Sequence, residues 1–502
     1  MNILLINVPS RGGEGGFIIP FGLLYVASIV ERSGHKVKIV DPYLYNIEPQ
    51  DFDSSGIAKI AGIIDDFNPS IIGYGGISTS YGRTKRLSQS VKEKYPNILQ
   101  IVGGPLSSVY ELLLKNAAID IVFHGETENN LPLFLDRLSR NEPIQHTEGI
   151  SYLSEGNVIK NKLPKQIENL DDIPLPAYHL IDLEKYLLNV DDWFGRYENS
   201  EKSANYSSVF KRTKKIQYYF PIITSRGCTH KCLFCYRHFV GVRQHSVTYV
   251  INHMKYLQQT YGINGFYIAD ELFNADPDWV FDYCNAIEKN GLEIGYIVTG
   301  ARINTTSEKM LQRLKETGCI EINYGQESGS DTILREYRKG VSRQQNTEIT
   351  LLTNKVGIPS TVQIVIGSPS ETNETINETI SFLKSVGADQ YSMNYLLPMP
   401  ETPIWKYVED NQLIDDVEKY LDRVADLGGG PIVNLTKIPD KIWRNWALVV
   451  ERKMKLYYLK RNRLLIKYFR ALARYFFMLE IVPLIPRRVK SIIKRVKTRL
   501  LV

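Results

Sequence analysis

Three of the chain's five cysteines lie within eight positions of one another, in the segment SRGCTHKCLFCYRH at residues 225–238. Cys228, Cys232 and Cys235 have the spacing Cys-x3-Cys-x2-Cys, so one loop can present three thiolates to a small metal centre. An iron–sulfur cubane held in this way keeps one iron open for a substrate. A structural zinc ion would need a fourth ligand, which a histidine of the same loop could supply. The three soft ligands favour the cluster, and zinc is the alternative.

The other two cysteines, Cys284 and Cys319, fall in predicted helix and strand interiors and are expected to be core residues. Five cysteines among 502 residues are too few for a disulfide framework, so the sequence indicates a reducing, cytoplasmic location. The N-terminal segment MNILLINVPS does not read as a signal peptide. No uninterrupted apolar run reaches the roughly 18 residues that a membrane-spanning helix needs.

The elements around the cysteine loop alternate regularly between strand and helix. Predicted strands cover residues 216–225, 265–273, 293–302, 319–330, 360–372 and 390–400. Predicted helices between them cover residues 247–262, 278–291, 307–318, 342–357 and 375–387. Six β/α units suit an open partial barrel, and the chemistry of β/α barrels gathers at the carboxyl ends of the strands. The cysteine loop directly follows the first of these strands.

Residues 1–145 alternate in the same way, with a shorter period. Strands are predicted at residues 2–8, 36–41, 69–76, 98–104 and 118–126, and helices at 22–35, 81–96 and 107–116. This pattern indicates a doubly wound parallel sheet, in which ligands sit beyond the carboxyl ends of the strands. The segment GGEGG (12–16) lacks the G-x-G-x-x-G spacing of a dinucleotide site, which disfavours that reading.

The sequence thus predicts an α/β protein: an N-terminal doubly wound parallel sheet, a (β/α)6 partial TIM barrel and a helical C-terminal tail. The expected limits are 1–145 for the first domain, 146–205 for a linker with one hairpin, 206–415 for the barrel and 416–502 for the helical basic region. From Arg452 to Val502 there are 16 Lys and Arg residues against one acid, Glu480, so this segment carries +15, and the rest of the chain carries −9 of the net charge of +6.

The segment TSRGCTHKCLFCY resembles the signature of the radical S-adenosylmethionine (radical SAM) superfamily. IADELF (268–273), NYGQESGS (323–330) and VIGSPSET (365–372) are similar to further motifs of that family, in the same order. The resemblance implies a 4Fe–4S cluster on the three cysteines and S-adenosylmethionine beside it. The implied contacts are Asp270 and Glu271 for the methionine amine, Glu327 and Ser328 for the ribose, Gly367 for the adenine, and Phe234 as the aromatic position of the signature.

A doubly wound domain before such a barrel resembles the cobalamin-binding subclass of the superfamily, through the segments GGIST (75–79), VGGPLSS (102–108) and HGETE (124–128). The implied cobalamin contacts are Ser78, Thr79, Gly103, Gly104, Pro105, Gly125 and Glu126. The D-x-H-x-x-G motif that supplies a histidine to cobalt elsewhere is absent, so no histidine is expected on the lower face. A flavodoxin-like regulatory domain without cofactor is the alternative.

The resemblance implies a radical SAM enzyme that makes a 5′-deoxyadenosyl radical and transfers a methyl group from methylcobalamin to an unactivated carbon. The alternatives are a radical cyclase or oxidoreductase with the same cofactors, and a non-catalytic cobalamin- or zinc-binding sensor or scaffold. The expected partners are a small-molecule substrate, with a lipid or isoprenoid as one candidate class, and an external one-electron donor; nucleic acid is not expected.

The C-terminal segment at residues 461–502 interleaves Arg and Lys with Leu, Ile, Phe and Tyr. A basic helix with such apolar residues can lie on an anionic membrane surface, so peripheral membrane contact is expected here. A helical cap on the barrel and a nucleic-acid contact are the two alternatives for the region, and the dense apolar residues disfavour the second.

Overall fold

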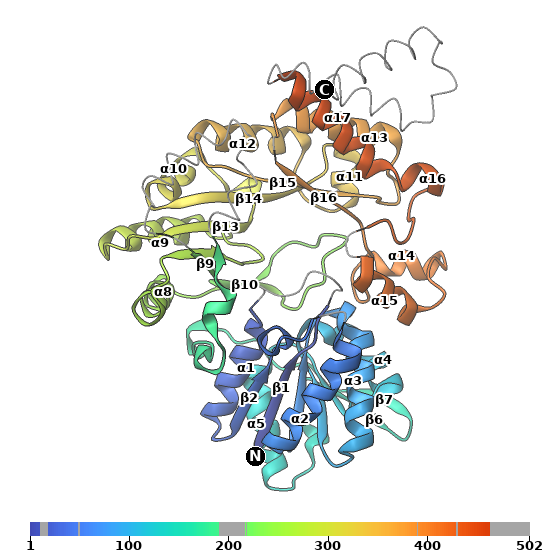
Figure 1. Ribbon diagram of the computed structural model, residues 1–502. Coiled ribbons are helices and arrows are strands. Elements are labelled where there is room, and N and C mark those ends of the chain that lie inside the picture. Colours follow the sequence, from blue (N-terminus) through green and yellow to red (C-terminus); the bar gives the residue numbers. More distant parts are fainter. Residues whose placement is uncertain are drawn as a thin grey trace, which may run out of the picture.

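The computed structural model describes residues 1–10, 19–48, 51–189, 216, 218–388, 390–427 and 430–461. Within these ranges the chain forms two α/β units followed by helices, as the sequence predicts. In Figure 1 the N-terminal unit, in blue, lies below the second unit. The basic segment 462–502 and the linker from 190 to 205 lie outside the described residues.

The front unit is a seven-stranded sheet in the order β2-β1-β3-β4-β5-β6-β7. The five parallel strands are β1 (Asn2–Asn7), β2 (Lys36–Val40), β3 (Ile71–Gly75), β4 (Leu99–Val102) and β5 (Ile121–Phe123). The helices are α1 (Phe21–Arg32), α2 (Ile57–Phe67), α3 (Tyr81–Lys94), α4 (Tyr110–Asn116) and α5 (Thr127–Ser139). Of these helices, α2 and α5 are not anticipated from the sequence.

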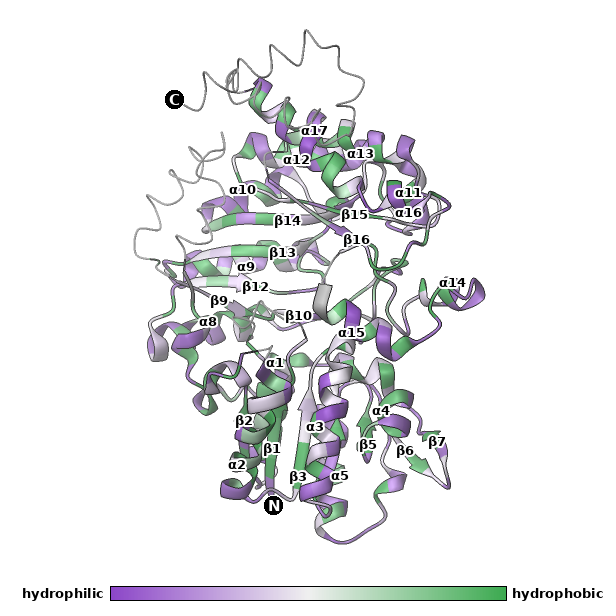
Figure 2. Cartoon of the chain, turned by 45° about the vertical axis from the view of Figure 1, so that its right-hand side comes forward, coloured by the Kyte–Doolittle hydropathy of each residue, from purple (hydrophilic) through white to green (hydrophobic). Residues whose placement is uncertain are grey.

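Apolar residues continue along the front strands because both faces of the sheet are covered. In β1, Ile3 and Leu5 join one core, whereas Leu4 and Ile6 join another on the opposite face. Figure 2 shows this strand as largely hydrophobic and β3 as hydrophobic in its first part. A sheet buried on both faces leaves only its strand ends for polar ligands, so the glycine loops beyond β3, β4 and β5 are the accessible part.

The hairpin expected in the linker belongs instead to the front sheet. Strands β6 (Ile150–Ser154) and β7 (Asn157–Lys160) pair antiparallel with each other, and β6 pairs with β5. The boundary expected at residue 145 therefore falls inside the sheet. The sequence does not reveal this pairing, because an exposed hairpin carries the same turn signal whether it stands alone or extends a sheet.

The second unit is an open sheet in the order β16-β15-β14-β13-β12-β9-β8. Its six parallel strands are β9 (Tyr218–Ile222), β12 (Gly265–Ile268), β13 (Gly295–Ala301), β14 (Cys319–Glu327), β15 (Val362–Ile366) and β16 (Tyr391–Tyr395). The short strand β8 (Leu188–Asn189) adds an antiparallel edge. The helices are α8 (Val247–Tyr261), α9 (Pro277–Lys289), α10 (Glu308–Glu316), α11 (Asp331–Glu336), α12 (Arg343–Val356) and α13 (Asn373–Ser385). The open partial barrel is confirmed.

The remaining helices are α14 (Trp405–Asp410), α15 (Val417–Leu427), α16 (Asp440–Trp443) and α17 (Trp446–Arg461). Leu421 and Val424 of α15 join the core of the front unit, while Val450 of α17 packs in one core with Ile380 of α13. Figure 1 shows α17 along α13 and α15 beside the front unit. A helical cap on the barrel is therefore present as far as Arg461. In the part of the chain described, no helix is both long and apolar enough to cross a membrane.

Candidate active site

The cysteine loop leaves the barrel through a small antiparallel ribbon, β10 (Ser225–Cys228) and β11 (Gly241–Gln244), which the sequence does not predict. Cys228 pairs with Gly241 at the ribbon's end. Gly227 has a φ of +86°, and a Cβ atom there would lie 2.3 Å from the Gly241 carbonyl oxygen. Glycine is therefore required beside the first cysteine. Further along the loop, the Leu233 amide donates to the Tyr337 carbonyl at 3.0 Å.

The cysteine thiols lie beside two cations. A hydrogen bond from the Cys235 thiol, together with the nearby Lys339 and Arg302 charges, lowers the pKa of Cys232 to about 6. The same bond raises the pKa of Cys235. Among the residues that the structure describes, no three His, Cys, Asp or Glu side chains are grouped so as to hold a single metal ion. The loop offers three thiols, one of them favoured as thiolate, and this donor set fits a thiolate-ligated cluster.

Asp270 and Glu271 follow β12 but have different surroundings. The Asp270 carboxylate is buried and accepts hydrogen bonds from the Thr224 amide at 2.7 Å and the Ser225 amide at 3.2 Å. The Thr224 hydroxyl donates to its second oxygen. Glu271 is exposed in the cavity described below and lines its wall. The structure thus gives Asp270 a role in fixing the start of the ribbon and leaves Glu271 as the carboxylate that can meet a ligand.

Glu327 is the last residue of β14, and Ser328 directly follows it. Glu327 has a φ of +61° and accepts a hydrogen bond from Lys339 Nζ at 2.9 Å, so one ion pair joins the predicted ribose contact to a cation near the cysteines. The Ser328 hydroxyl is buried and lies 3.2 Å from that of Thr379. The structure therefore places Glu327 beside the cysteine loop, and Ser328 in the packing behind it.

The other two predicted contacts shape the loops around the cysteines. Gly367 has a φ of +96°, and its amide donates to the buried Glu371 carboxylate. A Cβ atom on Gly367 would lie 3.1 Å from Trp443 Nε1, so a side chain would crowd this turn. Phe234 meets Tyr337 edge to face, with 5.1 Å between ring centroids. Phe234 thereby packs the cysteine loop against the end of α11.

A cavity of about 460 Å³ lies between the two units, at the carboxyl ends of both sets of strands. The front unit contributes five of the predicted cobalamin contacts, Gly103, Gly104, Pro105, Gly125 and Glu126. The second unit contributes residues of the ribbon and of the loop after β12, among them Ser225, Arg226, Gly227 and Glu271. The cavity therefore contacts the predicted cobalamin region and, of the predicted cluster and S-adenosylmethionine contacts, Glu271 alone.

The cavity wall fits a flat, bulky ligand. Gly104 and Gly125 have φ values of +69° and +71°, and no atom lies within 4 Å of a Cβ atom built on either. Backbone there can approach a ligand closely, as a corrin ring requires. Ser78 and Thr79 do not line the cavity: the Ser78 hydroxyl bonds Ser108 at 2.8 Å. Within the described ranges the buried Thr79 hydroxyl has no hydrogen-bond partner.

Several wall residues were missed by sequence reasoning. Tyr25, Glu128, Arg226 and Phe239 all line the cavity. Arg226 belongs to the cysteine segment at residues 225–238. Its positive charge lies beside turns at Gly227 and Gly241, and this was the signal that could have marked it as a site residue. His124 is buried and bonds the Ser151 hydroxyl at 2.8 Å, and burial lowers its pKa to about 4. It does not line the cavity, whereas His238 does.

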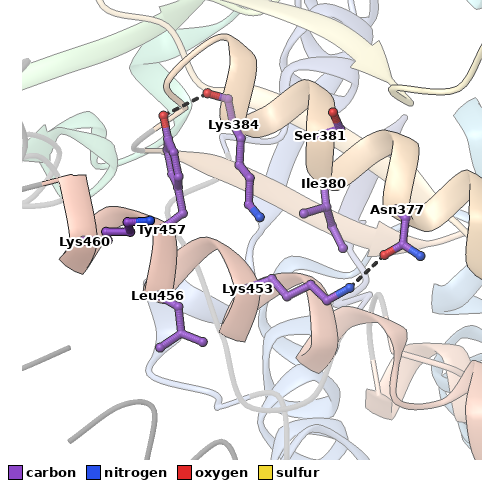
Figure 3. A pocket seen from close by; sticks show the side chains of 8 residues that line it. All are labelled: Asn377, Ile380, Ser381, Lys384, Lys453, Leu456, Tyr457 and Lys460. Carbon is purple, nitrogen blue, oxygen red and sulfur yellow. Dashed lines mark hydrogen bonds between the residues drawn. The ribbon is translucent and has the colours of Figure 1, made fainter. Parts of the chain in front are cut away.

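A second hollow of about 510 Å³ lies on the outer surface, between α13 and α17. Figure 3 shows Lys384, Lys453 and Lys460 around it, with Lys453 Nζ bonded to Asn377 at 2.7 Å. None of the predicted site residues lines this hollow.

Comparison with known proteins finds matches to both α/β units. A family model of the radical SAM superfamily matches residues 222–383, and one of the B12 binding domain matches residues 14–135. An uncharacterized methyltransferase of Pyrococcus horikoshii is 30% identical over 424 residues, which cover 82% of this chain and 84% of that protein. An anaerobic magnesium-protoporphyrin IX monomethyl ester cyclase of Rubrivivax gelatinosus is 24% identical over 470 residues, covering 91% and 79%.

The fold also matches a solved structure. The radical S-adenosylmethionine methyltransferase TsrM of Kitasatospora setae, with cobalamin and a 4Fe–4S cluster bound, superposes with a TM-score of 0.64. The match covers 82% of this chain and 75% of that one, at 16% identity. The two proteins therefore share the order and arrangement of their α/β units.

Proposed function

The chain belongs to the family of radical SAM proteins with a B12-binding domain, and from this premise we propose that it is a cobalamin-dependent radical SAM methyltransferase acting on an unactivated carbon of a small molecule. The family implies a 4Fe–4S cluster, S-adenosylmethionine and cobalamin as cofactors. The observation that carries the proposal is the single cavity shared by the glycine loops of the front unit and the ribbon that bears Cys228.

The chain's own residues would bind, orient and enclose these groups. Cys228, Cys232 and Cys235 would hold the cluster, while Glu271 and Glu327 would meet the amine and the ribose of S-adenosylmethionine. Gly103, Gly104 and Gly125 would let the backbone approach the corrin. When bound, the cofactors supply a hydrogen-abstracting radical and a transferable methyl group, while the protein supplies position and exclusion of water. An external donor would provide the electron.

A radical cyclisation or oxidation with the same cofactors is the second candidate. It is favoured by the likeness to the Rubrivivax gelatinosus cyclase, which covers 91% of this chain. The residues of the cavity wall serve either reaction, because both need the same radical beside an enclosed substrate.

The reaction is tested with anaerobically reconstituted protein, a reductant and S-adenosylmethionine carrying a labelled methyl group. Candidate small molecules are incubated with it and analysed by mass spectrometry. Methyl transfer predicts label in the product, whereas cyclisation predicts loss of hydrogen without label. A sensor or scaffold would bind cobalamin or zinc without cleaving S-adenosylmethionine, and this result would contradict both enzymatic readings.

We also propose peripheral membrane contact for the C-terminal region. Lys384, Lys453 and Lys460 gather on the surface from which the chain continues into the basic segment 462–502. Each basic residue near an anionic bilayer contributes on the order of 1 kcal/mol of binding. Co-sedimentation with phosphatidylserine vesicles should fall strongly when residues 462–502 are removed, and partly when the three lysines become glutamine. Equal sedimentation of the full chain, the truncated chain and the lysine variant would contradict membrane contact through this region.

A further inference from the structure

A group of four charges, of which Glu126 is buried and the other three are partly buried, joins the two units beside the cavity. Glu126 and Glu128 follow β5 in the front unit, and Arg226 and Arg243 lie on the ribbon. Arg226 donates to Glu126 Oε1 at 3.0 Å and to Glu128 Oε1 at 2.6 Å, and Arg243 donates to Glu126 Oε2 at 2.7 Å. The Glu126 side chain is 1% exposed and that of Arg226 is 10% exposed, so little water screens these pairs.

The carboxylate of Glu126 holds the ribbon in register. Arg226 and Arg243 are direct cross-strand partners, and two like charges in these positions repel each other. Glu126 accepts from both, one on each oxygen. Although burial alone would raise the pKa of Glu126, the bond from Arg243 and the charges of both arginines hold it below its ordinary value. The pairing of the ribbon therefore depends on a carboxylate that the other unit supplies.

The same front loop forms the cavity wall. Gly125 and Glu126 both line the cavity, and His238, which follows the third cysteine, donates from Nε2 to the Gly125 carbonyl at 3.1 Å. Arg226 is two residues from Cys228 on β10. A ligand that presses on the Gly125 loop thus acts on groups bonded to both sides of the cysteine loop, through contiguous hydrogen bonds and ion pairs.

We infer that Arg226 is a positioning residue that couples the cobalamin loop to the cluster loop, so that filling either site stabilises the other. The inference rests on the proposed function, because it needs both cofactors to bind. Coupling between two sites is reciprocal and commonly amounts to roughly 5- to 150-fold in affinity. Arg226 suits the task because its planar guanidinium can engage two carboxylates at once, which a lysine cannot do in the same geometry.

The test measures how fast a chelator removes cluster iron from the full-length protein, with and without hydroxocobalamin, by the loss of cluster absorbance. In the wild type, cobalamin should slow the loss by at least about fivefold, the lower end of common couplings. In Arg226→Lys and Glu128→Gln the ratio should fall below about twofold. Glu128→Gln leaves Glu126 paired with both arginines, so it carries the test if Arg226→Lys fails to fold.

Lys160→Gln is the matched control. Lys160 and Glu401 form another ion pair between the units, at 3.6 Å, but both side chains are more than a third exposed. This variant should keep the wild-type ratio. A wild type that carries iron, sulfide and cobalamin but shows a ratio of one, or the same ratio in both ribbon variants as in the wild type, would overturn the inference. A wild type that binds no cluster or no cobalamin would instead overturn the proposed function.

Discussion

Two neighbouring carboxylates at the end of β12 have different tasks. Asp270 accepts two backbone N–H groups and a hydroxyl in a buried position, whereas Glu271 lines the cavity. Asp270→Asn should therefore lower the free energy of unfolding by about 1–3 kcal/mol, because the amide leaves a buried donor without a partner. Glu271→Gln should leave unfolding nearly unchanged and weaken S-adenosylmethionine binding. Urea denaturation and equilibrium binding distinguish the two, and the opposite pattern would reverse the assignment.

The five cysteines separate into three proposed cluster ligands and two buried core residues, Cys284 and Cys319. Cys232→Ala should remove the cluster and abolish cleavage of S-adenosylmethionine. Cys284 is buried in α9, and Cys284→Ala should keep the cluster at a cost on the order of 1 kcal/mol in stability. Iron and sulfide analysis after anaerobic purification measures both. Full cluster content in Cys232→Ala would show that the ligand assignment is wrong.

At the residue scale, the sequence identified which residue types belong to the site, but it did not identify the hydrogen-bond and ion-pair partners of those residues. The cysteine spacing and the glycines of the cavity wall could be predicted, because each type has few other uses at such positions. The sequence could not predict that Asp270 accepts hydrogen bonds from backbone amides while Glu271 faces the cavity. The two residues are adjacent, and only the folded structure shows that their side chains have different surroundings. Arg226 was missed for the same reason: its partners lie about 100 residues away, in the other unit.

The ribbon that carries Cys228 depends on Gly227. Gly227→Ala should lower stability by more than about 1 kcal/mol and reduce cluster content, because a Cβ atom would meet the Gly241 carbonyl in a left-handed backbone conformation. Gly62 in α2 has no atom within 4 Å of a built Cβ atom. Gly62→Ala should instead raise stability by about 0.5–1 kcal/mol. Thermal unfolding and iron analysis test the pair, and a harmless Gly227→Ala would contradict the tight turn.

The loop after β15 should make stability depend on pH through Glu371. Burial raises the pKa of this carboxyl to about 8, from an ordinary value of 4.5, even though the amides of Gly367 and Ser368 donate to it. The folded state therefore holds the proton more tightly than the unfolded state does. The stabilisation is complete below about pH 4.5 and is lost as the pH rises through 8. Relative to Glu371→Gln, the wild type should lose free energy of unfolding between pH 5 and 9. If the free energy of unfolding changed with pH in the same way in both proteins, the raised pKa of Glu371 would be contradicted.

At the scale of elements, long periodic segments could be predicted and short ones could not. The six barrel strands and the helices between them carry strong patterns, and the predicted strand positions agree with β9 and with β12 to β16. The two strands of the ribbon, β10 and β11, have four residues each, so their alternation of apolar and polar residues is too short to predict a strand. The position of the β6–β7 hairpin on the front sheet depends on the pairing of β6 with β5, which a local sequence pattern does not reveal.

The molecule consists of two α/β units that face one cavity and that contact each other at two further places. The charges around Glu126 join them beside the cavity, and α15 brings a C-terminal segment back onto the front unit through Glu418, which forms an ion pair with Lys85 at 2.7 Å. Sequence reasoning predicted each unit but not these connections, because residues that are hundreds of positions apart leave no joint pattern in a single chain.

The central claim is that three cysteines and the glycine-lined wall hold a cluster and a cobalamin in one protein. The most direct measurement is metal and sulfide analysis of the anaerobically isolated full-length chain after reconstitution with iron, sulfide and hydroxocobalamin. The account predicts about four irons and four sulfides per chain, lost in Cys232→Ala, together with one cobalt. One tightly held zinc ion on the cysteines, with no cobalt retained, would contradict it.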